Sequence, residues 1–206
     1  MSSEFRGKGI VFSAPSGAGK TTLVRRLLAE RSDLRFSISA TNRPKRGTEI
    51  HGEDYFFLST EEFRTKAKAG GFLEWEEVYD FRFYGTPHGE VERIWASGHH
   101  VLFDVDVKGG VRIKKKMGDD VLSIFVKPPS LEVLRQRLIA RGTDDAHEID
   151  RRMAKAVSEM AFAEKFDWVL NNDDLETAVA EVIKRVNAFA PRPQQEGPTA
   201  PQTKTP

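Results

Sequence analysis

Residues 14–22 read Ala-Pro-Ser-Gly-Ala-Gly-Lys-Thr-Thr, and the organisation of the chain follows from them. They come after the apolar run 10–12 and open a helical pattern over 21–30. A strand, a glycine-rich loop and a helix in this order are typical of a phosphate-binding loop, whose backbone N–H groups surround an anion. Lys20 adds a full positive charge, and Thr21 offers a hydroxyl to Mg²⁺. The stretch therefore predicts a nucleotide phosphate site, with Ala14 standing where the usual pattern has glycine.

The composition is that of one large soluble domain. The 206 residues carry 32 basic and 31 acidic side chains, so a general attraction to nucleic acid is not expected. No apolar run has the length of a membrane span and no N-terminal signal pattern is seen, so no membrane partner is expected. The sequence holds no cysteine, which excludes disulfides and favours a cytoplasmic location.

Apolar runs that alternate with helical patterns predict an α/β fold, a P-loop-type parallel sheet flanked by helices on both faces. Strands are expected over 8–13, 35–39, 55–58, 72–79, 82–86, 100–105, 121–126 and 166–170, and helices over 21–30, 61–70, 90–96, 108–117, 131–138, 148–163 and 175–189. The stretch 35–86 breaks this rhythm, which predicts an inserted, mostly β lobe. After Ala190 the chain holds five of its ten prolines and few apolar residues, so a disordered tail is expected there.

Further motifs follow the loop in a specific order. They occupy residues 37–47, 51–57, 72–75, 84–86, 104–107, 141–143 and 172–175. With these motifs the chain resembles the guanylate kinases, the nucleoside monophosphate kinases that act on GMP. The resemblance implies one domain over 7–190, with a core of 7–34 and 99–190, a GMP-binding lobe over about 35–98 and a lid over about 138–152. The Pro-rich tail 191–206 lies outside it.

The resemblance implies a transferase that phosphorylates GMP to GDP with ATP and Mg²⁺ by direct in-line transfer, and that also accepts dGMP. The implied partners are the small molecules ATP and GMP. Two alternatives stay open: a peptide-binding module of the same fold that has lost catalysis, and a kinase for another phosphorylated acceptor. The intact phosphate loop argues against the first, and Glu74 with Ser39 and Asp106 favours guanine over other acceptors.

On the acceptor side, the resemblance assigns one group of residues to the GMP phosphate and another to the guanine base. The phosphate group comprises Arg43, Arg46, Tyr55 and Tyr84, and the base group comprises Glu74, Ser39, Thr86 and Asp106. Guanidinium forks suit a phosphate dianion, and a carboxylate suits the two adjacent donors of guanine. Taken alone, the arginines would be a solvated loop, the tyrosines half-buried strand residues, Ser39 and Thr86 solvent-facing strand residues, and Glu74 a surface acid.

On the donor side, the resemblance assigns ATP binding to the loop and to a segment after the last strand. These residues are Ser16, Gly17, Ala18, Gly19, Lys20, Thr21, Thr22, Asn172 and Asp173. Lys20 and the lid arginines Arg137, Arg141 and Arg152 are implied to stabilise the moving phosphoryl group, and Thr21 and, through water, Asp104 to hold Mg²⁺. The alternatives are helix caps for Asp104, Asp106 and the segment 172–174, an exposed helix face for the arginines, and Arg151 in place of Arg152.

Overall fold

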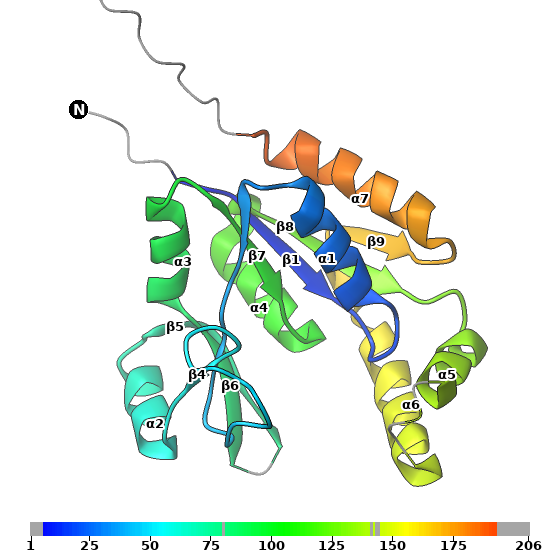
Figure 1. Ribbon diagram of the computed structural model, residues 1–206, viewed down its shortest axis with the longest axis horizontal. Helices are drawn as coiled ribbons and strands as arrows, with labels where there is room; N and C mark the ends of the chain where they lie inside the picture. The colour runs from blue at the N-terminus through cyan, green and yellow to red at the C-terminus, as the bar shows by residue number, and fades with distance from the viewer. Residues whose placement is uncertain (1–5, 80, 141, 143–144, 193–206) are drawn as a thin grey trace, which may run out of the picture.

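The computed structural model describes residues 6–79, 81–140, 142 and 145–192. Two sheets and their helices make up this part of the chain (Figure 1). The predicted disordered tail lies, beyond Arg192, outside the described residues, and so does the lid residue Arg141.

The larger sheet has five parallel strands in the order β2-β7-β1-β8-β9. Their bounds are β1 Gly9–Ser13, β2 Leu34–Phe36, β7 His100–Asp104, β8 Val121–Lys127 and β9 Trp168–Asn171. All five residues of β1 are buried, because the strand is central and covered on both faces. The α/β fold with a parallel sheet, predicted from the rhythm of the sequence, is confirmed.

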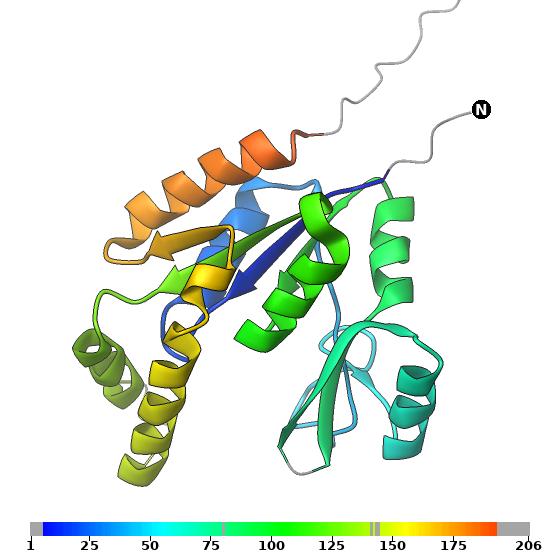
Figure 2. The same ribbon diagram turned by 180° about the vertical axis from the view of Figure 1, so that it is seen from behind.

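Each face of this sheet has its own hydrophobic core. Ile10 and Phe12 pack with helices α1 (Lys20–Glu30) and α7 (Leu175–Phe189) on one face, whereas Val11 packs with α3 (His88–Ala96) and α4 (Val107–Met117) on the other. Figures 1 and 2 show these helix pairs from the two sides of the molecule. Successive strand residues point to opposite faces, so a strand that is apolar throughout needs helices on both.

The smaller sheet forms a separate lobe of four strands in the order β4-β3-β6-β5. These are β3 Ala40–Thr41, β4 Phe56–Phe57, β5 Phe72–Tyr79 and β6 Arg82–Pro87, covered by α2 (Thr60–Lys68). Phe63 of α2 stacks on Phe72 and Phe83, with ring centroids 4.5 and 5.5 Å apart. Helix α2 begins with a capping box between Ser59 and Glu62, as the serine before the helical pattern predicts.

Only residues 35 and 36 of the strand expected over 35–39 lie in a strand. β2 ends at Phe36 and pairs with β7 of the large sheet, and the chain then crosses to β3 in the lobe. Helix α3, which the expected lobe boundary of 35–98 includes, also packs on the large sheet. An alternating pattern identifies a strand but does not tell which sheet the strand joins, so the predicted boundary differs from the observed strand pairing.

Helices α5 (Leu131–Ala140) and α6 (Ala146–Met160) extend beyond the carboxyl ends of the large sheet, on the same side as the lobe (Figures 1 and 2). Ser130 accepts from the Val133 N–H at the start of α5, and Asp145 accepts from the Glu148 N–H at the start of α6. Short 3₁₀ turns, Gly118–Asp120 and Ala163–Lys165, precede β8 and β9. The lobe and this helix pair therefore stand on either side of the sheet's carboxyl edge.

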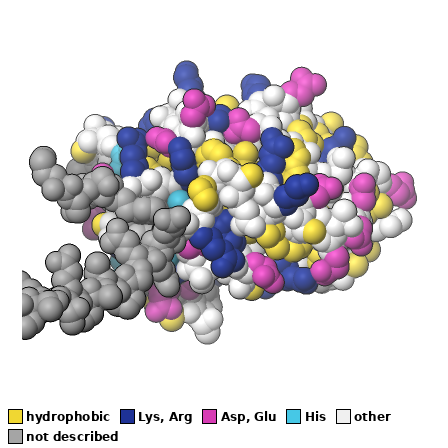
Figure 3. Space-filling view, turned by 90° about the horizontal axis from the view of Figure 1, so that it is seen from above, with side chains coloured by type: hydrophobic (Ala, Val, Ile, Leu, Met, Phe, Trp, Pro, Cys, Tyr) yellow, Lys and Arg dark blue, Asp and Glu magenta, His cyan; other side chains and the backbone are white. Residues whose placement is uncertain are grey.

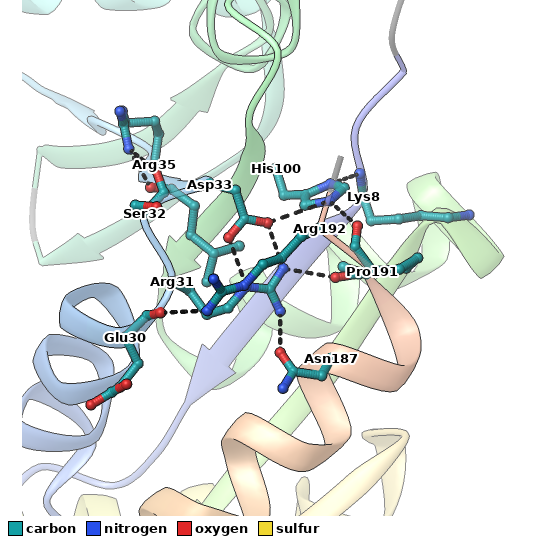
Figure 4. Close-up of polar contacts among 12 residues, drawn as sticks. Lys8, Glu30, Arg31, Ser32, Asp33, Arg35, His100, Asn187, Pro191 and Arg192 are labelled. Carbon is teal, nitrogen blue, oxygen red and sulfur yellow. Dashed lines mark hydrogen bonds and ion pairs between the residues drawn. The ribbon is translucent and has the colours of Figure 1, made fainter. Parts of the chain in front are cut away.

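A buried polar cluster joins the end of α1 to the end of α7 (Figure 4). Arg31, which is 0% exposed, donates two hydrogen bonds to Asp33 and one each to Asn187 and the Ala190 carbonyl, at 2.6–2.7 Å. His100 Nδ1 accepts from the Lys8 N–H at 2.9 Å. We call these residues the Arg31 cluster; it fixes the last described turn of the chain to the amino end of the sheet.

Replacing Arg31 with methionine is expected to lower the free energy of unfolding by about 3–5 kcal/mol. The Asp33 carboxylate and the Ala190 carbonyl would both lose the buried guanidinium that donates hydrogen bonds to them. Urea denaturation measures the change. Arg26→Met is the control, since Arg26 pairs with Glu176 at the surface and such pairs contribute about 1 kcal/mol or less. Equal losses in the two variants would contradict the assignment of the cluster as a main stabilising contact.

Charges are mixed on the face of the molecule seen in Figure 3, where basic and acidic side chains are interspersed. This agrees with the formal net charge of +1. Among the helices that the structure describes, none has the length and apolar character needed to cross a membrane. The cytoplasmic location expected from the sequence stays a prediction.

Candidate active site

A cavity of about 820 Å³ lies between the carboxyl ends of β1 and β7, the lobe and α6. Open parallel sheets bind their ligands at this edge. The structure brings most of the predicted site residues to its wall: Ser16, Gly17, Ala18, Gly19, Lys20, Thr21, Thr22, Ser39, Tyr55, Glu74, Tyr84, Asp104, Asp106 and Arg152. The predicted donor and acceptor residues therefore face one shared space.

The loop 14–19 turns through two glycines in the left-handed region, Gly17 at φ 96° and Gly19 at φ 94°. Gly19 is the N-cap of α1 and offers no capping side chain, so the first N–H groups of the helix are directed to the cavity rather than to a cap. This is the geometry of an anion site.

Asn172 and Arg137 support the loop from behind instead of lining the cavity. Asn172 is buried and donates to the Ala18 carbonyl at 2.7 Å, while Arg137 places its two terminal nitrogens 3.5 Å from the Ala18 and Asn172 carbonyls. The N-cap of α7 is Asp174, which accepts from the Thr177 N–H. The helix-cap alternative for this segment is thus correct for Asp174, and Asp173 is not among the cavity-lining residues.

Substituting Gly19 with alanine is expected to weaken ATP binding at least about tenfold. The new Cβ would lie 2.3 Å from Asn172 Nδ2, at a positive φ that costs about 1–2 kcal/mol for a non-glycine residue. Gly98→Ala is the control, because Gly98 also has positive φ (76°) but nothing within 4 Å. Calorimetric titration with ATP should separate the two variants; the same affinity in both would contradict a role of the Gly19 backbone in binding ATP.

Lys20 and Asp104 form an ion pair at the base of the cavity. Burial lowers the pKa of Lys20 to about 8, while the nearby Asp106 and Glu159 carboxylates oppose that shift. The lysine therefore keeps its charge near neutral pH. The cap alternative is correct for Asp106, which accepts from the Gly109 N–H at 2.7 Å as N-cap of α4 and also lines the cavity.

The residues at this point fit a magnesium ion bound together with a nucleotide. Thr21 and Asp104 supply hard oxygen atoms, and both line the cavity beside the loop. Within the described residues no group of three or more His, Asp or Glu side chains could hold a metal alone. Mg²⁺ in kinase sites is held by one or two protein oxygens plus substrate phosphates, so a pair of donors is the arrangement it requires.

Glu74 on β5 is buried in the wall opposite the loop, with 7% of its surface exposed. Thr86 on the paired strand β6 donates its hydroxyl to Glu74 Oε1 at 2.9 Å. Burial raises the pKa of Glu74 to about 7; the Thr86 hydrogen bond lowers it and Asp106 raises it further. The surface-acid alternative is therefore wrong for Glu74. Its neighbour Trp75, whose side chain lies on the opposite face of the strand, is 44% exposed.

Tyr55 and Tyr84 line the same cavity as Glu74, with their ring centroids 6.2 Å apart. Arg43 is only 5% exposed and donates two hydrogen bonds of 2.6 Å to Glu49, with its guanidinium 4.8 Å from the Tyr55 ring centroid. The solvated-loop alternative is therefore wrong for Arg43. Arg46 is exposed, and neither arginine is among the residues that line the cavity.

Helix α6 directs Arg152 toward the loop, where its Nη1 donates to Ser16 Oγ at 3.0 Å. Both Arg151 and Arg152 contact Glu148, but only Arg152 is among the residues that line the cavity. Lys155 and Glu159 also line the cavity, and the sequence reasoning missed them. Their spacing from Arg152, three and seven residues, places all three on one helix face, and that signal could have found them.

A phosphate loop at the carboxyl edge of a parallel sheet, opening into a cavity that the lobe also lines, defines a protein of the P-loop nucleotide-binding class. Comparisons with known proteins identify the family. The guanylate kinase family model matches residues 6–188. The guanylate kinase of Bacteroides fragilis is 55% identical over 182 residues, covering 88% of this chain and 89% of that protein. That of Bacteroides thetaiotaomicron is 54% identical over 186 residues, covering 90% and 91%.

A crystal structure of guanylate kinase from Anaplasma phagocytophilum is similar in fold, with a TM-score of 0.69 at 30% identity, covering 90% of this chain and 88% of that one. The chain belongs to the guanylate kinase family. It is accordingly a nucleotide-binding kinase, a transferase.

Proposed function

We propose that this enzyme transfers the γ-phosphoryl group of ATP to GMP, giving ADP and GDP, and that dGMP is also an acceptor. The observation that carries the proposal is the buried Glu74 carboxylate, which faces the phosphate loop across one cavity. The names of the relatives support the same acceptor. We further propose three working parts: a core, an acceptor lobe built on the small sheet, and a lid around the start of α6.

The acceptor pocket selects guanine through complementary hydrogen bonds. The guanine edge offers a ring N–H and an amine side by side, and a carboxylate accepts both. Thr86 holds one oxygen of Glu74 in place, and Ser39 and Asp106 complete the pocket. Adenine has no ring N–H at that position and would leave the buried carboxylate partly unpaired, at a cost of about 1–3 kcal/mol or more.

The GMP phosphate binds near Tyr55 and Tyr84, with Arg43 and Arg46 as its cationic partners. Both tyrosine hydroxyls can donate to the phosphate from the cavity wall. The Arg43 guanidinium donates two hydrogen bonds to the Glu49 carboxylate. Phosphate binding therefore requires that Arg43 exchange this carboxylate for the incoming anion, a rearrangement within one loop.

In the transfer step a phosphate oxygen of GMP attacks the γ-phosphorus in line, and the bond to the ADP oxygen breaks. The attacking oxygen is already anionic, so no general base is needed, and catalysis rests on positioning and charge. Lys20 and the lid arginines Arg137, Arg141 and Arg152 stabilise the charge on the transferred group; Arg137, which contacts the Ala18 and Asn172 carbonyls, reaches that group when the lid closes. Thr21 and, through water, Asp104 would hold magnesium, which would supply positive charge to neutralise the phosphates. Closure of lobe and lid excludes water, which would otherwise accept the phosphoryl group.

The test is ADP formation with a panel of acceptors: GMP, dGMP, AMP, CMP, UMP and a phosphorylated sugar. We expect turnover with GMP and dGMP and at most about one ten-thousandth of that efficiency with AMP. Chelation of divalent cations should abolish turnover. An enzyme that prefers a different acceptor would overturn the proposal, and one that binds GMP without forming ADP would indicate a binding module.

A further inference from the structure

One guanidinium contacts three consecutive residues of the strand that carries Glu74. Arg112 on α4 donates to Glu76 Oε2 at 2.7 Å and to the Trp75 carbonyl at 2.9 Å, and its Nη1 lies 3.8 Å from Glu74 Oε2. Glu74 and Glu76 both line the cavity. Arg112 therefore reaches the proposed acceptor pocket from α4, through contacts that the proposed mechanism does not use.

These contacts cross from the core to the lobe. α4 is anchored in the core of the large sheet through Ile113, whereas β5 belongs to the small sheet. The first turn of α4 packs directly against the carboxylate, because a Cβ at Gly109 would lie 3.1 Å from Glu74 Oε2. Arg112 thus fixes the position of β5 relative to the helix at the point where the base would bind.

Arg112 carries a positive charge, unlike Asp106, Glu76 and Thr86, which also influence Glu74. Asp106 at the start of α4 and Glu76 on β5 are both negative, and Thr86 on β6 contributes a neutral hydroxyl. Burial, Asp106 and Glu76 all raise the pKa of Glu74, whereas Arg112 and the Thr86 hydrogen bond lower it. Guanine binding needs the carboxylate, since a protonated acid would place its own proton against one of the guanine donors.

We propose that Arg112 is a positioning residue for base selection: it holds Glu74 in place and in its charged form for the guanine edge. The proposal rests on GMP being the acceptor. Lys108 provides a matched control, because it lies on the same helix one turn earlier and also pairs with Glu76, at 2.9 Å. Lys108 is 55% exposed and Arg112 39%, so both can be replaced without opening the core.

The experiment compares wild type, Arg112→Met, Arg112→Lys and Lys108→Met, with KM for GMP, KM for ATP and kcat measured from pH 6 to pH 9. In Arg112→Met, a rise of one unit in the pKa of Glu74 from 7 would increase KM for GMP about fivefold at pH 7 and almost not at all at pH 9. KM for ATP should stay unchanged. Arg112→Lys should recover part of the shift, and Lys108→Met should follow the wild-type profile.

Calorimetry of GMP binding in two buffers of different ionisation enthalpy gives a second measure that does not depend on turnover. At pH 7.5 Arg112→Met should release more protons on binding GMP than wild type does, because more of its Glu74 is protonated beforehand. A KM for GMP that rises equally at every pH, an unchanged profile, or the same shift in Lys108→Met would overturn the proposal. Failure of wild type to phosphorylate GMP would instead refute the proposed function.

Discussion

Replacing Lys20 with methionine is expected to lower kcat for GDP formation by about 100-fold or more. The lysine ammonium lies at the base of the cavity in an ion pair with Asp104, at the start of the helix that the phosphate loop opens. A preorganised donor directed at the charge of the transition state typically contributes about 10²–10³ in kcat. Since the charge on the moving phosphoryl group is what the lysine stabilises, kcat should fall more than KM for ATP rises.

Steady-state ADP formation measures this effect, with Lys115→Met as the control, because Lys115 is an exposed residue of α4. Thermal unfolding of both variants checks that the fold is intact. A Lys20→Met enzyme with kcat within a few-fold of wild type would remove the loop lysine from the mechanism.

Replacing Glu74 with glutamine is expected to lower kcat/KM for GMP by about 100-fold while leaving ATP affinity unchanged. The amide keeps the size of the side chain but turns one acceptor into a donor, which then faces a guanine donor without a partner, at about 1–3 kcal/mol. The position is buried and hydrogen-bonded to Thr86, so water cannot repair the mismatch. Glu77→Gln on the same strand is the control, because Glu77 is exposed.

The same residue predicts how GMP binding depends on pH. The pKa of Glu74 is raised to about 7, so below this pH the nucleotide-free protein holds a proton that must leave when guanine binds. KM for GMP should therefore be about tenfold higher at pH 6 than at pH 8. The GMP phosphate itself titrates near pH 6. Glu74→Gln removes only the Glu74 contribution, so identical pH profiles in the two enzymes would refute the role of the carboxylate.

Local pattern predicted the large sheet because each of its strands is a short apolar run between helical segments, as in β1 and β8. Only the resemblance placed the loop 14–22 and Glu74 in one site, since 51 residues lie between Thr22 and Glu74. Pattern failed where an alternating stretch passes between two sheets, as at Phe36, because alternation records faces and not partners.

The sequence indicates where a residue lies more readily than it indicates which hydrogen bonds the side chain makes. Residues 43–46 alone do not predict that the Arg43 guanidinium binds the Glu49 carboxylate, because this pairing depends on how the loop folds. Asn172 was assigned to the nucleotide side, yet it contacts the Ala18 carbonyl, a contact that depends on β9 extending two residues past the level at which β1 ends. Such contacts follow from tertiary geometry, which a linear pattern does not contain.

The Arg31 cluster determines where an attachment to this enzyme would be harmless. It holds Pro191 and Arg192 at the amino end of the sheet (Figure 4), while the cavity lies at the carboxyl end. A fluorophore or surface tether introduced at Arg192 would therefore sit across the full depth of the sheet from the reacting phosphates. An enzyme immobilised at this point would keep the entrance of the cavity free, so that the proposed closure of lobe and lid could be observed.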